Sequence, residues 1–307
     1  MVNTVSIITP SYNQGQFLEE TIKSVICQEG DFLIDYIIMD GGSTDNSTEI
    51  IKKYDNLLKN GNWPIQCRGI KYRWTSEKDK GQTDAVNKGF ALAEGEFLGW
   101  LNSDDTYLPR AVMKAVDYFS THPDDVMVYG NAYLTNKDSV VTSSYPSKYF
   151  SLKKLAGSCY ICQPAVFMRA AAVNEVGELD ANLQTCMDYD LWIRMGKRFE
   201  GKIAFIKDYL ATSRMYGENK SLSMRDKVYE ECISTVRKHF GYVDARWIIS
   251  CILDVFRENH KQSLPRLIRK LGSRLFTLRY FLQLRTIKSL YSLFKSMLLD
   301  RKESESI

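Results

Sequence analysis

The residues best suited to chemistry are polar side chains that follow apolar runs. Asp104 and Asp105 come directly after one such run. Adjacent carboxylates repel each other unless hydrogen-bond donors or a cation compensate for their charge. A hard divalent ion with oxygen ligands does this and can bridge a carboxylate and a diphosphate. The alternative is a capped turn, since Ser-Asp-Asp before a helix is also a common N-terminal sequence.

A second candidate group is made of thiols. Cys159 and Cys162 have the CxxC spacing of a zinc or redox site, and folding could bring Cys186 near them. A closed zinc site needs four ligands, and the sequence contains no second CxxC or HxxxH pair. The seven cysteines are odd in number and scattered, which predicts reduced structural thiols rather than a disulfide framework.

Alternating strands and helices must position these side chains. Apolar runs predict strands over residues 5–9, 36–39, 70–74 and 96–101. Helical spacing or capping residues follow each run, over residues 17–26, from residues 45–47, over 83–93 and from Pro109. This pattern indicates an α/β fold whose mostly parallel central sheet has helices on both faces.

Each predicted strand delivers polar residues at its carboxyl end. These are residues 9–13, Asp40, residues 77–81, and the pair Asp104 and Asp105. In open α/β sheets ligands bind along this edge, so the sequence predicts a single cleft. Short strands and turns follow over residues 127–167, and a helix over 187–199. We place the catalytic domain at residues 1–220 and a helical basic region at 221–307.

Composition and hydropathy argue against a disordered, fibrous, secreted or membrane-spanning protein. Of the 307 residues 44% are hydrophobic and 25% charged, as in an ordinary folded protein. The first residues lack the pattern of a secretory signal, so we expect a cytoplasmic protein. The apolar stretches are shorter than the roughly 18–20 residues that cross a bilayer.

The C-terminal region is basic. From Arg225 onward 17 Lys/Arg and 9 Asp/Glu give 17 − 9 = +8, whereas the rest of the chain carries 24 − 28 = −4. Residues 259–299 contain nine Lys/Arg and no acid, interleaved with Leu, Ile and Phe. A helical tail of this kind, interrupted at Pro265, predicts peripheral contact with the anionic inner face of the plasma membrane. The alternatives are a helix packed on the catalytic domain and a helix that binds a partner; no nucleic-acid-reading motif is present.

Five ordered blocks resemble the family 2 glycosyltransferases of the GT-A fold over roughly residues 4–220. They read SIITPSYNQGQFLEETIKSV, IIMDGGSTDNSTEII, DKGQTDAVNKGFALAEGEFLGWLNSDD, QPAVFMR and MDYDLWIRM. The resemblance depends on the order and spacing of the five blocks, because a single short block can occur by chance in unrelated sequences.

The resemblance implies a nucleotide site near the first two strands. Thr9, Pro10 and Tyr12 would lie against the base, and Asp40 would accept a hydrogen bond from the base or ribose. Asp84 would contact the donor sugar. The alternatives are a strand-end turn for Asp40 and a favourable charge at a helix N-terminus for Asp84.

The resemblance also implies that the donor lies on Asn102, Ser103 and Asp104, with Mg²⁺ or Mn²⁺ on Asp104 and Asp105. The chain departs from the usual Asp-x-Asp or Asp-x-Asp-Asp motif, because Asn102 holds the first place. It departs again at residues 214–216, where Arg-Met-Tyr stands in the setting of an Arg-x-His segment.

Asp188 matches the family's general base, a carboxylate that takes the proton of the attacking sugar hydroxyl. Asp190 lies about 200° further round a helix, so we expect a structural role for it. The alternative is that both acids cap or solvate the helix. Gln163 and Pro164 resemble a family position near the reaction centre.

The implied activity is that of an inverting, metal-dependent hexosyltransferase in polysaccharide or lipid-linked glycan biosynthesis. The donor would be a nucleotide diphosphate sugar, with UDP the commonest nucleotide and GDP or dTDP alternatives. The acceptor would be a glycan or lipid-linked sugar. A catalytically silent nucleotide-sugar-binding or scaffold protein is the other interpretation; Asn102 and Tyr216 favour it and Asp188 opposes it.

Overall fold

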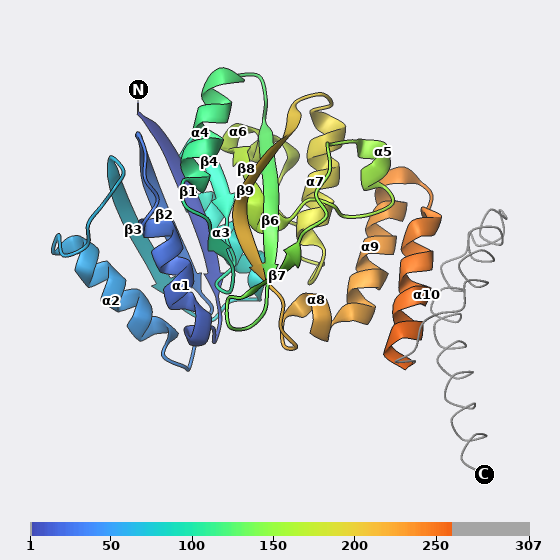
Figure 1. The fold of residues 1–307 in the computed structure, drawn as a ribbon, viewed down its shortest axis with the longest axis horizontal. Coiled ribbons are helices and arrows are strands. Elements are labelled where there is room, and N and C mark those ends of the chain that lie inside the picture. The colour runs from blue at the N-terminus through green and yellow to red at the C-terminus, as the bar shows by residue number, and fades with distance from the viewer. Residues whose placement is uncertain (1, 260–307) are drawn as a thin grey trace, which may run out of the picture. The chain divides into compact units, whose positions relative to one another are not determined.

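Nine strands form one sheet in the computed structural model, which describes residues 2–259 (Figure 1). The strands are β1 (Asn3–Ser11), β2 (Phe32–Asp40), β3 (Gly69–Ser76), β4 (Phe97–Trp100), β5 (Thr106–Tyr107), β6 (Met127–Thr135), β7 (Val141–Ser144), β8 (Val166–Arg169) and β9 (Ile203–Arg214). Their order is β3-β2-β1-β4-β8-β6-β9-β5, and β7 pairs with β6.

Helices alternate with the strands along the chain and follow the last of them. The first part of the chain contains α1 (Gly15–Ile26), α2 (Ser47–Lys59), α3 (Gln82–Leu92), α4 (Ala111–Thr121), α5 (Leu152–Leu155), the 3₁₀ turn η1 (Gln163–Ala165), α6 (Ala170–Val176), α7 (Met187–Arg198) and α8 (Lys220–Ser223). Two longer helices follow, α9 (Arg225–Phe240) and α10 (Ala245–Asn259).

The N-terminal half of the sheet confirms the predicted βα units. Strands β1 to β4 pair in parallel, with Val5 opposite both Ile34 and Phe97. The four predicted strands and the helices after them all form, so the carboxyl ends of these strands meet at one edge of the sheet.

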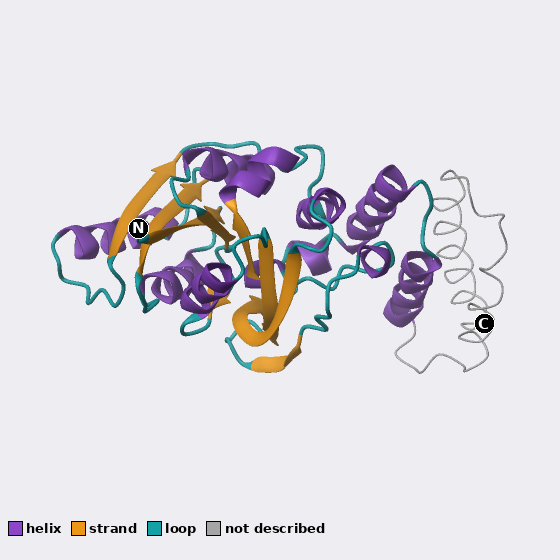
Figure 2. Ribbon diagram, turned by 90° about the horizontal axis from the view of Figure 1, so that it is seen from above, coloured by secondary structure: helices purple, strands orange, loops and turns teal. Residues whose placement is uncertain are grey.

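Alternate residues of the strands face opposite layers of helices. Ile34 and Ile38 of β2 belong to the large core cluster that contains residues of α1, α2 and α4. Ile37 and Met39 of the same strand instead contact Ala85 of α3. This two-residue period is that of a strand buried on both faces, and Figure 2 shows helices on both sides of the sheet.

The C-terminal half of the sheet is mixed. Strand β8 is antiparallel to β4 and β6, β9 is parallel to β6, and β5 is antiparallel to β9. Sequence patterns did not predict β9. Its pairing with β6 shifts register twice around Asn131, and its buried residues follow no regular alternation.

The chain divides into two compact units. The first holds residues up to Leu155 together with Cys159–Arg225, and the second holds Ala156–Ser158 together with the described residues from Asp226 on. Helices α9 and α10 confirm the helical start of the basic region. The basic stretch of residues 259–299 and Pro265 lie outside the described residues, apart from Asn259. Within the described part of the chain, each helix is too short or too polar to cross a bilayer.

Candidate functional site

A cleft of about 850 Å³ opens in the first unit where the parallel strands end. The size is that of a site for a small organic ligand. The loops after β1, β2, β3 and β4 line it, together with α7 and the segment after β9. Their lining residues include Pro10, Tyr12, Gly41, Asp79, Asn102, Ser103, Asp104, Asp105, Asp188, Tyr216 and Lys220.

Asn13 fixes the loop that carries Tyr12. Its backbone is left-handed, with φ 51°, a conformation that asparagine tolerates. Its N–H donates to Ser43 Oγ over 2.8 Å, and its side-chain oxygen accepts from the Thr44 N–H over 2.8 Å. Tyr12 lines the cleft with 59% of its surface exposed, so its ring is available to stack on a base.

Thr9 and Asp40 are buried and are not among the residues that line the cleft. Thr9 is fully buried, 3.2 Å from the Tyr36 hydroxyl. Asp40 accepts hydrogen bonds from the Ser43 N–H and hydroxyl and from the Ser76 hydroxyl, at 2.9, 2.6 and 2.7 Å. These contacts shape the loops, and the direct nucleotide contacts of both residues stay predictions.

Asp84 also lies outside the cleft lining. It pairs with Lys88 over 3.0 Å and accepts from the Lys80 N–H, and both contacts lower its pKa. Gln82 and Ala85 are the residues of α3 that line the cleft. The donor-sugar contact of Asp84 therefore stays a prediction.

Asn102 uses its whole amide group within the protein. Its Oδ1 accepts from Gln82 Nε2 and Trp100 Nε1, at 2.7 and 2.9 Å. Its Nδ2 donates to Gln163 Oε1 over 3.0 Å and to Asp105 Oδ2 over 3.4 Å. A carboxylate at this position has no hydrogen to donate to either acceptor. The amide is therefore the side chain that this network requires.

The two adjacent carboxylates differ in their surroundings. Asp105 is 4% exposed, and its Oδ1 accepts the Arg214 N–H over 2.9 Å while Oδ2 faces Asn102. Burial and the charge of Asp104 raise the pKa of Asp105 well above its usual value. Burial likewise raises the pKa of Asp104, whose Oδ2 accepts the Tyr216 hydroxyl over 3.0 Å.

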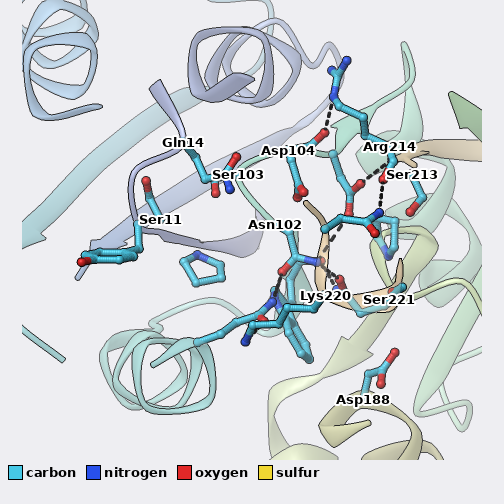
Figure 3. A pocket seen from close by; sticks show the side chains of 18 of the residues that line it. Ser11, Gln14, Asn102, Ser103, Asp104, Asp188, Ser213, Arg214, Lys220 and Ser221 are labelled. Atoms are coloured by element: carbon cyan, nitrogen blue, oxygen red, sulfur yellow. Dashed lines mark hydrogen bonds between the residues drawn. The ribbon is translucent and has the colours of Figure 1, made fainter. Parts of the chain in front are cut away.

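Asp104 is the carboxylate that fits a divalent cation. It faces the cleft (Figure 3), and among the described residues its Oδ1 accepts no side-chain hydrogen bond. Both oxygens of Asp105 are engaged by donors, so its role as a ligand stays a prediction. Residues 2–259 contain no group of three His, Cys, Asp or Glu that could hold a metal ion. A cation at Asp104 would need further oxygen ligands from a diphosphate and water.

Arg214, at the end of β9, braces this acidic turn. Its guanidinium donates to the Asp104 carbonyl over 2.9 Å, to Ser139 Oγ over 2.8 Å and to Glu20 over 2.6 Å. It also lies 4.5 Å from the centre of the Phe17 ring. The Arg214 side chain therefore holds the acidic turn in position.

Asp188 lies in the first turn of α7 and its half-buried carboxylate lines the same cleft (Figure 3). Burial raises its pKa to about 6, although the Tyr189 N–H donates to it over 2.7 Å. The neighbours that respond to its charge are Tyr145, Cys159 and Cys162, whose own pKa values are raised mainly by burial. Asp188 thus lies beside neutral groups, and its raised pKa of about 6 suits a proton acceptor.

Asp190 has the structural role predicted for it. It is 1% exposed and forms an ion pair with Arg194 over 2.7 Å.

Several cleft residues escaped sequence reasoning. Lys220 donates to Gln82 Oε1 over 2.9 Å and to the Gln184 carbonyl over 3.3 Å. Gln82 lies in the same sequence block as Asp84 and could have been proposed from that block, whereas Asp79 belongs to residues 77–81, which the sequence analysis predicted to lie at the cleft. Lys220 stands in a segment without a pattern, so only the fold reveals it.

The profile of the family described as Glycosyl transferase family 2 matches residues 6–176. The chain belongs to this family.

Two curated relatives that match the chain are considerably longer than it is. The chain is 27% identical over 226 residues to the chondroitin synthase of Escherichia coli, covering 73% of this chain and 31% of that protein. It is 27% identical over 238 residues to an uncharacterized glycosyltransferase of Rickettsia conorii, covering 74% and 36%. The chain thus spans about a third of the length of these curated relatives.

Solved glycosyltransferases share the fold, which confirms the GT-A prediction. S. aureus TarS 1–349 in complex with UDP has a TM-score of 0.55 at 18% identity, covering 92% of this chain and 73% of TarS. A mannosyltransferase from Pyrobaculum calidifontis in complex with GDP-Man and Mn²⁺ has a TM-score of 0.58 at 12% identity, covering 97% and 85%.

Proposed function

We propose that this chain is an inverting glycosyltransferase that moves a sugar from a nucleotide diphosphate sugar to an acceptor hydroxyl. The observation that carries the proposal is Asp188. Its carboxylate has a pKa of about 6 and lines the same cleft as Asp104, which fits a cation. A general base works best when its pKa lies near the working pH.

In this mechanism Asp188 accepts the proton of the acceptor hydroxyl while that oxygen attacks the anomeric carbon. The bond between this carbon and the diphosphate oxygen breaks, and the nucleoside diphosphate leaves with the electron pair. A single displacement inverts the anomeric configuration. Tyr12 and Pro10, which line the cleft, would hold the nucleotide base, and Asn102 donates to Asp105 and Gln163.

Asp104 would hold Mg²⁺ or Mn²⁺, and Asp105 would support it. When bound, the cation neutralises the charge that develops on the leaving diphosphate. The mannosyltransferase with GDP-Man and Mn²⁺ and the TarS complexes with UDP and UDP-GlcNAc support a metal and a nucleotide sugar here. UDP is our first choice of nucleotide, and a hexose derivative our first choice of sugar.

The acceptor we propose is a growing polysaccharide or a lipid-linked glycan. The relationship to a chondroitin synthase supports a polysaccharide acceptor. The basic tail would then hold the enzyme at the inner face of the membrane, where such acceptors are made.

A nucleotide-sugar screen tests the proposal. We expect one donor to release its nucleoside diphosphate when Mg²⁺ or Mn²⁺ is present and an excess of EDTA to stop the release. Proton NMR of the transferred product should show an inverted anomeric configuration. Tight donor binding without turnover for every donor and acceptor offered would instead favour the catalytically silent binding protein.

The pH profile gives an independent prediction. Asp188 must be ionised to accept a proton, so kcat/KM should be constant above its pKa of about 6 and fall about tenfold per pH unit below it. Asp104 also has a raised pKa, and its protonation would weaken binding rather than proton transfer. Measuring Mg²⁺-UDP affinity at each pH separates the two effects. A rate that is flat down to pH 5 would remove Asp188 as the base.

A further inference from the structure

Tyr216 is the side chain that touches Asp104. Its hydroxyl lies 3.0 Å from Asp104 Oδ2 and 3.4 Å from Gln14 Nε2. A phenol has one hydrogen, so it donates to the carboxylate and accepts from the amide. A tyrosine hydroxyl ordinarily keeps its hydrogen at neutral pH, so this hydrogen is available to the carboxylate.

The ring of Tyr216 is held as firmly as its hydroxyl. Its centre lies 5.0 Å from that of Phe17, and Phe17 in turn lies beneath the Arg214 guanidinium. Tyr216 is 7% exposed. The phenol is therefore a fixed donor that orients Asp104 through Oδ2. Among the described residues Asp104 Oδ1 accepts no side-chain hydrogen bond, so it is the oxygen with both lone pairs available to a cation.

Among the groups that line the cleft near Asp104, Gln14 and Ser103 offer oxygen atoms. Figure 3 shows Gln14 and Ser103 beside it. Within residues 2–259 no histidine lines the cleft. Cys162 lines it, but burial raises its pKa well above the usual value, so it remains a thiol rather than a thiolate ligand.

We propose that Tyr216 is a positioning residue that holds Asp104 as a one-oxygen ligand in an all-oxygen site, which selects Mg²⁺ over later transition metals. Carboxylate, diphosphate and water suit Mg²⁺ and Mn²⁺, whereas a nitrogen ligand strengthens binding along the series from Mn²⁺ to Ni²⁺. One carboxylate oxygen is a weak site by itself, so the cation is bound together with the donor diphosphate. The inference rests on the proposed function, because it requires a cation at Asp104.

Mn²⁺ binding followed by electron paramagnetic resonance tests this without any turnover. For the wild-type chain we expect weak Mn²⁺ binding alone and much tighter binding with UDP. Tyr216→Phe keeps the ring against Phe17 but removes the donor, and should weaken Mn²⁺-UDP binding about tenfold, the worth of one hydrogen bond to a charged group. Tyr216→His offers a nitrogen, and competition titrations should show its preference for Ni²⁺ over Mg²⁺ raised about tenfold or more.

Tyr118→Phe is the matched control. It removes a phenol that donates to a carboxylate, Asp125, outside the cleft lining, so Mn²⁺-UDP affinity should not change. Thermal melts establish that each variant is folded. Wild-type affinity in Tyr216→Phe, or an unchanged Ni²⁺ to Mg²⁺ ratio in a folded Tyr216→His, overturns the inference alone. A wild-type chain that binds UDP but no cation overturns the cation site of the proposed function as well.

Discussion

Replacing Asp188 by asparagine is expected to slow sugar transfer by about 10² to 10⁴-fold, the usual cost of losing a general base. The amide cannot take the proton of the acceptor hydroxyl, but it has nearly the same shape. Loss of the Asp188 carboxylate also removes the free-energy cost of burying that charged group, whose pKa is raised to about 6 in the folded chain. The variant should therefore remain folded and bind Mg²⁺-UDP as the wild type does.

Stopped assays of transfer, calorimetry with UDP and a thermal melt check these three expectations together. Asp117→Asn is a matched control, since this exposed carboxylate of α4 lies outside the cleft lining. Asp188→Glu keeps the acid but moves it, and should recover part of the lost rate. Near-normal transfer by Asp188→Asn would place the base on another residue.

Replacing Asp104 by alanine should have the second-largest effect, a loss of metal-dependent UDP affinity of about 30-fold or more, as for truncation of one partner of a buried charge pair. Asp104 has an oxygen that faces the cleft and would bind the cation. Without the cation, the diphosphate loses its electrostatic attraction to the site. Calorimetry with and without EDTA measures the effect. The metal-free affinity of the variant should match that of the wild type, because the base contacts at Tyr12 are unchanged.

Asp105 supplies the contrast. Its oxygens accept the Arg214 N–H and the Asn102 amide, so Asp105→Ala should lower the melting temperature as well as UDP affinity. Asp105→Asn retains an acceptor for the Arg214 N–H and should do less harm than Asp104→Asn. UDP affinity that is independent of metal in the wild type, or equal in all these variants, would contradict both expectations.

The parallel half of the fold was predictable because its signals are local. Apolar runs such as residues 5–9 are followed by helical spacing within the next twenty residues, and the polar residues at their ends fall together by topology. Strand β9 was not predictable in this way. It pairs with β6, some 75 residues earlier in the chain, with an irregular register. Nothing within its own sequence specifies that pairing.

The same distinction applies to the site. That Asp104, Asp105 and Asp188 share a cleft was predicted from sequence blocks, and the cleft lining contains all three. Which oxygen of the acidic pair faces the cleft depends on the Arg214 N–H and the Tyr216 hydroxyl. These partners lie more than a hundred residues downstream, so the division of roles required the fold.

The brace at Arg214 has a consequence for how the protein is made. During synthesis the acidic turn at residues 104–105 leaves the ribosome long before Arg214, which supplies its N–H and guanidinium donors. A domain generally folds as a unit, so the donors that fix this turn become available only after the last strand has been made. Nascent chains that stop after residue 176 contain the whole family-matched segment, yet they lack Asp188, Arg214 and Tyr216. Under the proposed function, chains that stop there lack the proposed base and the groups that position the acidic pair, so they should not bind the donor as the whole chain does.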